Sequence, residues 1–483
     1  MRTERRTDSV RKPLHLSARS HNNQLSPAFD ASICAALVAG IAVAPFWLGG
    51  NRPIAWAINA LWACGLVIIY ELRIAMQGGA HPVALRRVWP AAAALAATGL
   101  WGVAQMSSWV PLTYQNPIWG MAREALELNV SGSISVNRDA TALALLRLVT
   151  AACVFWLALQ LGRFAWRAML IVQAVAVIGF AYALYGLVAF FAFPKTILWF
   201  DKVHYLDAVT STFINRNSYA TYAAIGLIAS VGAALSAFAA GANRGGGRQA
   251  VRLMASLTGP AGGWLAVGAI IALALVLTGS RGGITAGFLG LGVAAVLSVM
   301  LRRNRRSTAA VAAVLALLMV LGIALTFGEL LATRLSAQGF RADDRLAVYA
   351  TVMMSIWDQP LLGFGYGTFE HVFPMYRDAR IDPIVKWDKA HNTYLEVFQG
   401  LGIPVAILFI AGVGSLIWRT FRGALGRRRN VTIPIVASAA SVAVLVHGLV
   451  DFSLQIQGVT LTWLALLGVG VAQSWSMELD VGS

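Results

Sequence analysis

Residues 261–301 read AGGWLAVGAIIALALVLTGSRGGITAGFLGLGVAAVLSVML. The stretch holds two apolar runs, 261–278 and 283–301, which follow one another with almost no linker. Each run is close to the roughly 20 apolar residues that a helix needs to cross about 30 Å of hydrocarbon, and neither contains a charged residue. The stretch therefore predicts two consecutive membrane-spanning helices joined by a tight turn.

The composition of the whole chain agrees with a lipid environment. Of its 483 residues, 58% are hydrophobic and 12% are charged, whereas a soluble domain is about 45–50% apolar and about 25% charged. Disorder requires low hydrophobicity and a disulfide scaffold requires many cysteines, so both are excluded. Cys34, Cys64 and Cys153 lie inside apolar runs, where a thiol usually acts as a small hydrophobic side chain, and we assign them no function.

Apolar runs long enough to span a membrane recur along the chain. They predict an all-α integral membrane protein with about 12 transmembrane helices. The expected spans are 31–48, 54–70, 88–106, 140–161, 168–192, 217–240, 261–278, 283–301, 308–327, 400–418, 431–450 and 458–475. Small residues such as Gly226, Gly287 and Gly290 are expected to allow close approach between these helices.

Basic residues are distributed unequally between the connections of these spans. An even number of spans places both chain ends on one side, and the connections on that side carry the whole net charge of +17. The positive-inside rule makes this side cytoplasmic, including the tails 1–30 and 476–483. The first apolar run lacks a small-residue cleavage site, so we expect it to be retained. Because the basic clusters are short loops beside spans, we interpret them as topology signals and contacts with anionic membrane lipid, with no nucleic-acid partner.

The longer connections lie on the opposite side. Two of them, 107–139 and 193–216, interrupt the first nine spans within 31–327. The third, 328–399, separates these spans from the last three within 400–475. Long connections of this size are usually functional or disordered. Since 328–399 mixes aromatic with charged residues, we expect a folded, partly helical periplasmic lobe between spans nine and ten.

Helical spacing is visible inside this lobe. Apolar residues predict a helix over 345–357, which a glycine-rich turn at Gly363–Gly367 follows. A second, short helix is expected to start near His391, which would place His391, Tyr394 and Leu395 on one face. The positive end of that helix would favour a neutral imidazole able to accept a proton. A structural His391 bonded to loop backbone remains the alternative.

Arginines at two expected helix starts are candidate anion-binding groups. Arg281 lies in the turn Thr278–Gly283, where glycines let the backbone approach a ligand and the guanidinium offers a planar fork of donors. Snorkelling of Arg281 to lipid headgroups is the alternative. Asn215, Arg216 and Asn217 precede the sixth expected span. Backbone N–H groups there, together with Arg216, would form an anion site, with simple capping by asparagine as the alternative.

Ionisable residues within the expected spans are few. Arg147 is the strongly basic residue that we place inside a span, which makes it a functional candidate, although arginine at this depth can also snorkel outward. His447 and Asp451 are four residues apart near the end of a span, and we interpret them as a structural pair on one helix face. No metal-binding, phosphate-loop or dinucleotide signature occurs, so we expect no obligatory metal and no cofactor.

Several of these motifs occur in a characteristic order. The segments are Ser211–Asn217, Leu277–Gly283, Arg345 with Trp357 and Gly363–Gly365, and Ala390–Leu395. In order and spacing they resemble the O-antigen ligase and polymerase superfamily. The resemblance implies catalytic roles for Arg281, Arg345 and His391, and we expect the substrate-binding residues to be Arg216, Asn215, Asn217, Arg147, Asn392 and Tyr394. Relatives often have proline between the two asparagines, so Arg216 departs from the pattern.

The resemblance also implies a substrate class and a location. The family consists of glycosyltransferases of the bacterial cytoplasmic (inner) membrane, which act on the periplasmic side on glycans carried by undecaprenyl diphosphate. Ligases transfer the glycan to lipid A core in lipopolysaccharide biosynthesis, and polymerases join repeat units for O-antigen, capsule or exopolysaccharide. Other polysaccharide assembly proteins are further candidate partners. The sequence does not separate ligase from polymerase, because both use the same donor.

The chemistry of such a transfer agrees with the residues present. A sugar diphosphate donor already contains a good leaving group, so it needs cations for the departing diphosphate and a base for the acceptor hydroxyl. Arg281 with Arg345 would hold the diphosphate, and His391 would take the proton in a single inverting displacement. Two alternatives remain: a transporter or flippase of polyprenyl-linked saccharides, and a non-catalytic subunit of a polysaccharide assembly complex.

Overall fold

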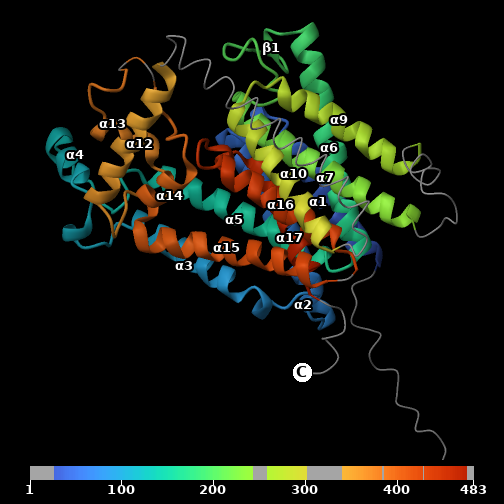
Figure 1. Cartoon of the computed structure of the whole chain (residues 1–483). Coiled ribbons are helices and arrows are strands. Elements are labelled where there is room, and N and C mark those ends of the chain that lie inside the picture. The colour runs from blue at the N-terminus through green and yellow to red at the C-terminus, as the bar shows by residue number, and fades with distance from the viewer. Residues whose placement is uncertain are drawn as a thin grey trace, which may run out of the picture.

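The computed structural model describes residues 27–242, 258–301 and 340–475, apart from positions 383, 385 and 428. Helices form almost all of the regular structure in these residues (Figure 1). The α-helices are α1 (Pro27–Val43), α2 (Pro53–Gln77), α3 (Trp89–Met106), α4 (Ile118–Leu126), α5 (Arg138–Leu161), α6 (Ala165–Ala192), α7 (Arg216–Ala242), α9 (Pro260–Val276), α10 (Arg281–Leu301), α12 (Phe340–Asp358), α13 (Phe369–Tyr376), α14 (Thr393–Leu401), α15 (Ile403–Gly426), α16 (Thr432–His447) and α17 (Gln457–Ala472).

Short elements complete the described fold. The 3-10 helices are η1 (Leu48–Gly50), η2 (Leu85–Arg87), η3 (Leu112–Tyr114) and η4 (Ser453–Gln455). Strands β1 (Thr196–Ile197) and β2 (Phe200–Asp201) pair antiparallel in a small hairpin after α6. The expected all-helical architecture is therefore confirmed, with this hairpin as a small addition.

Apolar helices of membrane-spanning length are present. Six described helices are long and apolar enough to cross a membrane, and they are α2, α5, α6, α7, α10 and α15. Helices α1, α9, α16 and α17 are apolar but shorter. The expected span 308–327 lies outside the described residues, as do most of tail 1–30 and the tail 476–483. The total of about 12 spans and the domain boundaries therefore stay predictions.

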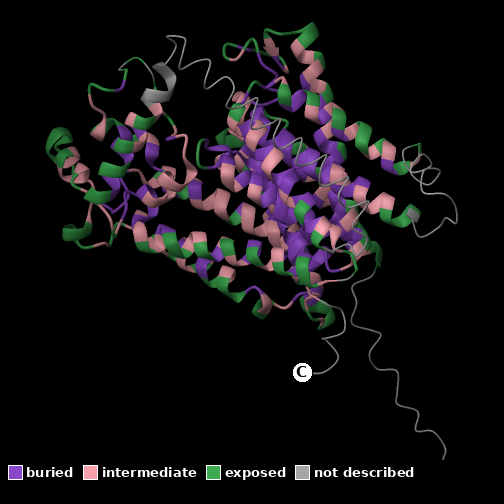
Figure 2. Ribbon diagram, in the orientation of Figure 1, coloured by how far each residue is buried: buried purple, intermediate pink, exposed green. Residues whose placement is uncertain are grey.

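The burial pattern separates a packed interior from an apolar outer surface. Buried residues gather in α7, α16 and α17 (Figure 2). Large apolar side chains also point outward, including Leu61 at 78% exposure and Met76 at 79%. Extended apolar exposure is unfavourable in water but matches contact with lipid.

Glycines allow two close helix contacts in this interior. An ideal Cβ at Gly226 of α7 would lie 3.3 Å from the Cα of Gly179 in α6. A Cβ at Gly290 of α10 would lie 2.8 Å from the carbonyl oxygen of Ala439 in α16. The expected role of small residues in helix packing is confirmed at both glycines, since any side chain would push the backbones apart.

Helices α12, α13 and α14 lie together with α4 beside one end of the long helices (Figure 1). They have a hydrophobic core of their own, in which Val348 and Val352 of α12 meet Phe369 and Phe373 of α13. The helix predicted over 345–357 is confirmed as α12. The described part of the segment 328–399 therefore folds, as its aromatic content indicated, while its periplasmic location remains a prediction.

Candidate active site

His391 lies immediately before α14 and not inside it. Asn392 is the N-cap, since its side-chain oxygen accepts hydrogen bonds from the backbone N–H groups of Tyr394 and Leu395 at 3.0 and 3.1 Å. His391 has a φ of 54°, in the left-handed region. The predicted placement of His391 in the first helical turn, on one face with Tyr394, is therefore wrong. Asparagine is a strong capping residue, and it ends the loop one residue after His391.

The surrounding structure holds His391 on several sides. The Tyr349 hydroxyl of α12 donates a hydrogen bond to the His391 carbonyl oxygen at 2.9 Å. The imidazole ring lies edge-on against Phe452, with centroids 4.9 Å apart, and against Trp387 at 5.7 Å. A left-handed backbone at a non-glycine residue persists only where its surroundings maintain it, and such positions are common at functional sites. The contacts with α12 and the two aromatic rings supply that support.

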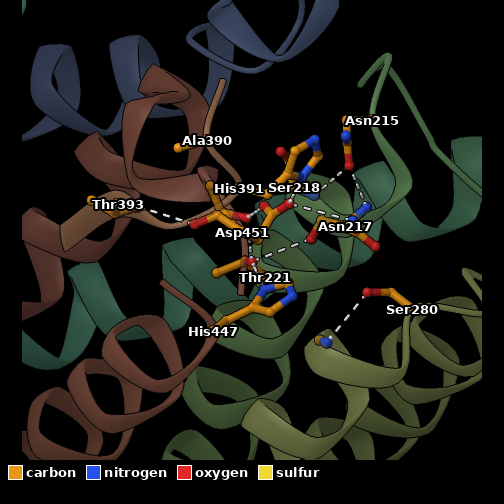
Figure 3. A network of polar contacts seen from close by, with 12 residues as sticks. Asn215, Asn217, Ser218, Thr221, Ser280, Ala390, His391, Thr393, His447 and Asp451 are labelled. Atoms are coloured by element: carbon orange, nitrogen blue, oxygen red, sulfur yellow. Dashed lines mark hydrogen bonds and ion pairs between the residues drawn. The ribbon is translucent and has the colours of Figure 1, made fainter. Parts of the chain in front are cut away.

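Asp451 is the carboxylate that faces His391 (Figure 3). Its Oδ1 lies 3.5 Å from Nδ1 of His391 and its side chain is fully buried. The distance suits an ion pair and is longer than a usual hydrogen bond. The Asn217 amide donates to the same oxygen at 3.3 Å, and the Ser453 hydroxyl donates to Oδ2. Asp451 therefore joins the start of α7 to the His391 loop.

The polar neighbours of Asp451 keep it ionised. Burial by itself raises the pKa of a carboxyl group. Here that effect is outweighed by the polar contact with His391, the charges of His447 and His391, and the Ser453 hydroxyl, so that the pKa of Asp451 lies below its ordinary value. The site therefore contains a buried negative charge beside an imidazole, which favours a proton on the imidazole nitrogen that faces it.

His447 and Asp451 do not form the predicted pair on one helix face. Helix α16 ends at His447, and Asp451 lies in the loop that leads to η4. The Nδ1 of His447 instead lies 2.5 Å from the Thr221 hydroxyl, which donates to the Ser453 hydroxyl at 2.8 Å. Because Gly448 follows His447 and the chain turns away, the two side chains reach different partners.

The turn that carries Arg281 packs against this network. Arg281 is the first residue of α10 and its side chain is exposed. A Cβ at the next residue, Gly282, would lie 3.1 Å from the His447 ring. The Ser280 hydroxyl accepts a hydrogen bond from the Gly283 N–H at 3.3 Å, which caps the helix start (Figure 3). The backbone of Arg281 therefore lies next to Gly282, the residue that packs against the His447 ring.

Asn215, Arg216 and Asn217 have different contacts. The Asn215 side chain accepts hydrogen bonds from the N–H groups of Asn217 and Ser218, so it caps α7. The Arg216 guanidinium lies over the Tyr205 ring at 5.2 Å. A Cβ at Gly279 would lie 3.4 Å from its Nη1, so Arg216 borders the turn before Arg281. The capping alternative is confirmed for Asn215, while Asn217 reaches Asp451.

Arg345 lies one helical turn before Tyr349 on α12. Its side chain is half-buried. Since Tyr349 holds the His391 carbonyl, Arg345 approaches the same network from the α12 side. The described structure thus brings together His391, Arg345, the turn of Arg281 and the start of α7.

Two further candidates serve different contacts. The Tyr394 hydroxyl donates to the Leu445 carbonyl at 2.9 Å, which attaches α14 to α16. Arg147 lies apart from the network around Asp451, with its guanidinium over the Trp56 ring at 4.4 Å. In the residues described, no group of three or more His, Cys, Asp or Glu side chains gathers as metal ligands. The ionisable groups of the network are arginines, histidines and one carboxylate.

A second carboxyl group, that of the half-buried Glu396 of α14, supports the His391 loop from another direction. Its Oε1 accepts a hydrogen bond from the Ala390 N–H at 2.7 Å, and its Oε2 accepts one from the Gln455 amide at 2.7 Å. Asp451 and Glu396 were not among the expected site residues. Both contact the loop around His391. Asp451 itself lies in the segment between α16 and α17, and Glu396 contacts that segment through Gln455.

These features are those of a multi-pass membrane protein in which a network of polar side chains links α7, α16 and the His391 loop (Figure 3). Residues 266–410 match the family model described as O-antigen ligase. The match confirms the predicted resemblance to the O-antigen ligase and polymerase superfamily and supports a function of that type. Arg281, Arg345 and His391 lie inside the matched range, and Asp451 lies outside it. A comparison with curated proteins gives no match.

Proposed function

We propose that this protein is a metal-independent, inverting glycosyltransferase of lipopolysaccharide or exopolysaccharide biosynthesis. It moves a glycan from undecaprenyl diphosphate to a sugar hydroxyl of the acceptor, at the periplasmic face of the bacterial inner membrane. The observation that carries the proposal is the pairing of His391 with the buried Asp451 among helix starts that bear arginine. The match to the O-antigen ligase family over 266–410 supports it.

His391 acts as the general base. Because Nδ1 faces the ionised Asp451, the proton resides on Nδ1 and the lone pair on Nε2 is free to accept the acceptor proton. Asp451 then stabilises the imidazolium that forms, in the manner of the carboxylate of a catalytic triad. The Tyr349 hydrogen bond and the aromatic rings fix the orientation of the imidazole.

Arg281 and Arg345 stabilise the departing diphosphate. As the glycosidic bond breaks, negative charge develops on the leaving group, and preorganised guanidinium groups bind phosphate oxygens through charge-assisted hydrogen bonds. Arg216 borders the same turn and assists. No general acid is required, since a diphosphate is a good leaving group.

The test is glycan transfer by the purified full-length protein in detergent, with lipid-linked glycan and acceptor. We expect His391→Ala to lower the transfer rate by about 100- to 10,000-fold, the contribution of a general base. Arg281→Ala should lower it by about 100- to 1000-fold, as expected for one transition-state donor. His371→Ala is the matched control, because His371 is exposed on α13 and outside the network.

The same assay separates the alternatives. A flippase needs a sealed bilayer and leaves the glycosidic bond intact, so product formed in detergent excludes it. A non-catalytic subunit tolerates His391→Ala. Near-normal transfer by a folded His391→Ala protein would refute the proposed base. In a deletion strain, accumulated single repeats indicate a missing polymerase, and long lipid-linked chains indicate a missing ligase.

A further inference from the structure

Arg147 of α5 carries a charge that its protein neighbours leave without a hydrogen bond. Its Nε is buried and has no partner, and no ion pair joins the guanidinium to a carboxylate in the described part of the chain. The group stacks instead on the Trp56 ring at 4.4 Å. A buried guanidinium N–H without an acceptor is unfavourable, because it loses water and gains no replacement.

The surroundings of Arg147 are rigid. The Trp56 indole N–H donates to the Gly50 carbonyl at 3.0 Å, which fixes the ring below the guanidinium. A Cβ at Gly367 would lie 3.7 Å from Nη2 of Arg147, so the glycine-rich turn borders it closely. The Tyr366 N–H in this turn is held by Gln105 at 3.1 Å. Arg147 is thus presented by elements that are themselves anchored.

Glu396 makes no hydrogen bond or ion pair with Arg147 among the described residues. Both carboxyl oxygens of Glu396 already accept hydrogen bonds, from the Ala390 N–H and from Gln455. Glu396 therefore leaves the donors of Arg147 unsatisfied. The guanidinium keeps the capacity to bind a further anion.

The position of Arg147 separates it from the proposed diphosphate site. Helices α7 and α10, which begin with Arg216 and Arg281, pack on each other and on α16, whereas α5 packs on α2, α3 and α17. The segment between α16 and α17 links the two regions, since Asp451 contacts Asn217 while Gln455 contacts Glu396. His391 touches this segment between the two regions. In a single displacement the acceptor approaches from the side opposite the leaving group. A second cationic region, that of Arg147, near the proposed general base His391 therefore suits the acceptor.

We propose that Arg147, supported on Trp56, binds an acidic group of the acceptor glycan, a carboxylate or a phosphate. This inference rests on the proposed transferase function and adds a specificity-determining residue to it. The guanidinium fork matches either anion through two parallel hydrogen bonds. The fixed Trp56 ring holds the fork in one orientation, so recognition requires little rearrangement.

The experiment measures transfer with native acceptor purified from a strain that lacks this protein. One portion is kept intact, one is carboxyl-reduced and one is dephosphorylated, which distinguishes the two anions. For wild type, removal of the relevant acidic group should raise the KM for acceptor by about 10- to 100-fold, as expected for loss of a charged hydrogen-bonded pair. Arg147→Gln should show the raised KM already with intact acceptor, and neither treatment should change it further.

The readout isolates acceptor binding. The KM for donor should stay unchanged in Arg147→Gln, while Arg281→Gln should lower kcat. Arg147→Lys keeps the charge without the fork and should give an intermediate KM for acceptor, which also tests the idea if Arg147→Gln fails to fold. Arg380→Gln is the control, because Arg380 is exposed and pairs with Asp378.

Three results would overturn the inference. In the first, removal of the acidic groups raises the KM for acceptor by the same factor in wild type and in Arg147→Gln. In the second, wild type is indifferent to both treatments of the acceptor. In the third, Arg147→Gln raises the KM for donor, which would assign Arg147 to the diphosphate. Complete absence of transfer by wild type would instead refute the proposed function, and the inference with it.

Discussion

Two carboxyl groups flank His391, the buried Asp451 and the half-buried Glu396, and they are held in opposite ways. Asp451 is contacted by His391, Asn217 and Ser453, and these polar neighbours outweigh burial, so its pKa lies below the ordinary value. Glu396 accepts hydrogen bonds from a backbone N–H and from Gln455, and burial raises its pKa above the ordinary value despite those contacts. The same chemical group thus has opposite protonation tendencies at two places beside one loop.

The difference indicates that Asp451 contributes its charge to catalysis, whereas Glu396 contributes its hydrogen bonds to the structure. Asp451 remains ionised beside the imidazole, which is the state needed to orient and stabilise a general base. Glu396 connects the backbone before His391 to Gln455 of η4, a task that a neutral side chain can also perform. Substitutions that remove the charge and keep the shape should therefore affect the two sites very differently.

Of the two carboxyl groups, Asp451 should have the larger effect on catalysis, measured in Asp451→Asn. The amide keeps the size of the side chain but removes the charge that selects the His391 tautomer. We expect the transfer rate to fall about 10- to 100-fold, a part of the contribution that a general base makes. The measurement is kcat with saturating donor and acceptor, with Asp378→Asn as the control because Asp378 lies on the surface. A rate within twofold of wild type would remove Asp451 from the mechanism.

Local sequence signals predicted much of this architecture. Long apolar runs predicted the long apolar helices, because crossing hydrocarbon demands length and apolarity in one continuous segment. The apolar spacing over 345–357 predicted α12, and Asn215 was recognised as a possible cap. The position of His391 outside α14 was also readable, since asparagine at position 392 is a far better N-cap than histidine.

Contacts between distant segments were not readable in the same way. Asp451 meets His391 only because the α16–α17 loop folds back toward α14, where the Thr393 N–H donates to the Gly448 carbonyl at 2.9 Å. No periodicity within either segment encodes that approach. Glu396 likewise looks like an ordinary acidic residue in a first helical turn until its burial is known.

The pH dependence of stability should show the opposite signs directly. The folded pKa of Asp451 is lower than its unfolded pKa, so its contribution is present above the ordinary value of 3.8 and is lost as pH falls through the folded pKa. The folded pKa of Glu396 is higher than its unfolded pKa, so its contribution is present below the ordinary value of 4.5 and is lost as pH rises through the folded pKa.

Thermal unfolding in detergent from pH 4 to pH 8 measures the contributions of Asp451 and Glu396 to stability. Asp451→Asn should be less stable than wild type across this range, by about 1–3 kcal/mol for the loss of hydrogen bonds to a charged group. The deficit should shrink only on further acidification. A deficit that grows as pH falls would mean that Asp451 is protonated in the folded protein, contrary to the contacts around it.

The smallest expected effect is on catalysis by Glu396→Gln. The glutamine oxygen can still accept from the Ala390 N–H, and reversal of the Gln455 amide preserves the second hydrogen bond, so the His391 loop keeps its support. We expect the transfer rate to stay within about threefold of wild type, because a neutral isostere that keeps its hydrogen bonds costs little. Stability should equal that of wild type near pH 4 and exceed it at neutral pH, where wild type bears the cost of a buried charge.

Glu396→Ala is the contrast, since it leaves the Ala390 N–H unsatisfied and should lower both stability and rate. If Glu396→Gln impaired transfer as strongly as Asp451→Asn, the charge of Glu396 would be needed for chemistry, and the division between the two carboxyl groups would fail.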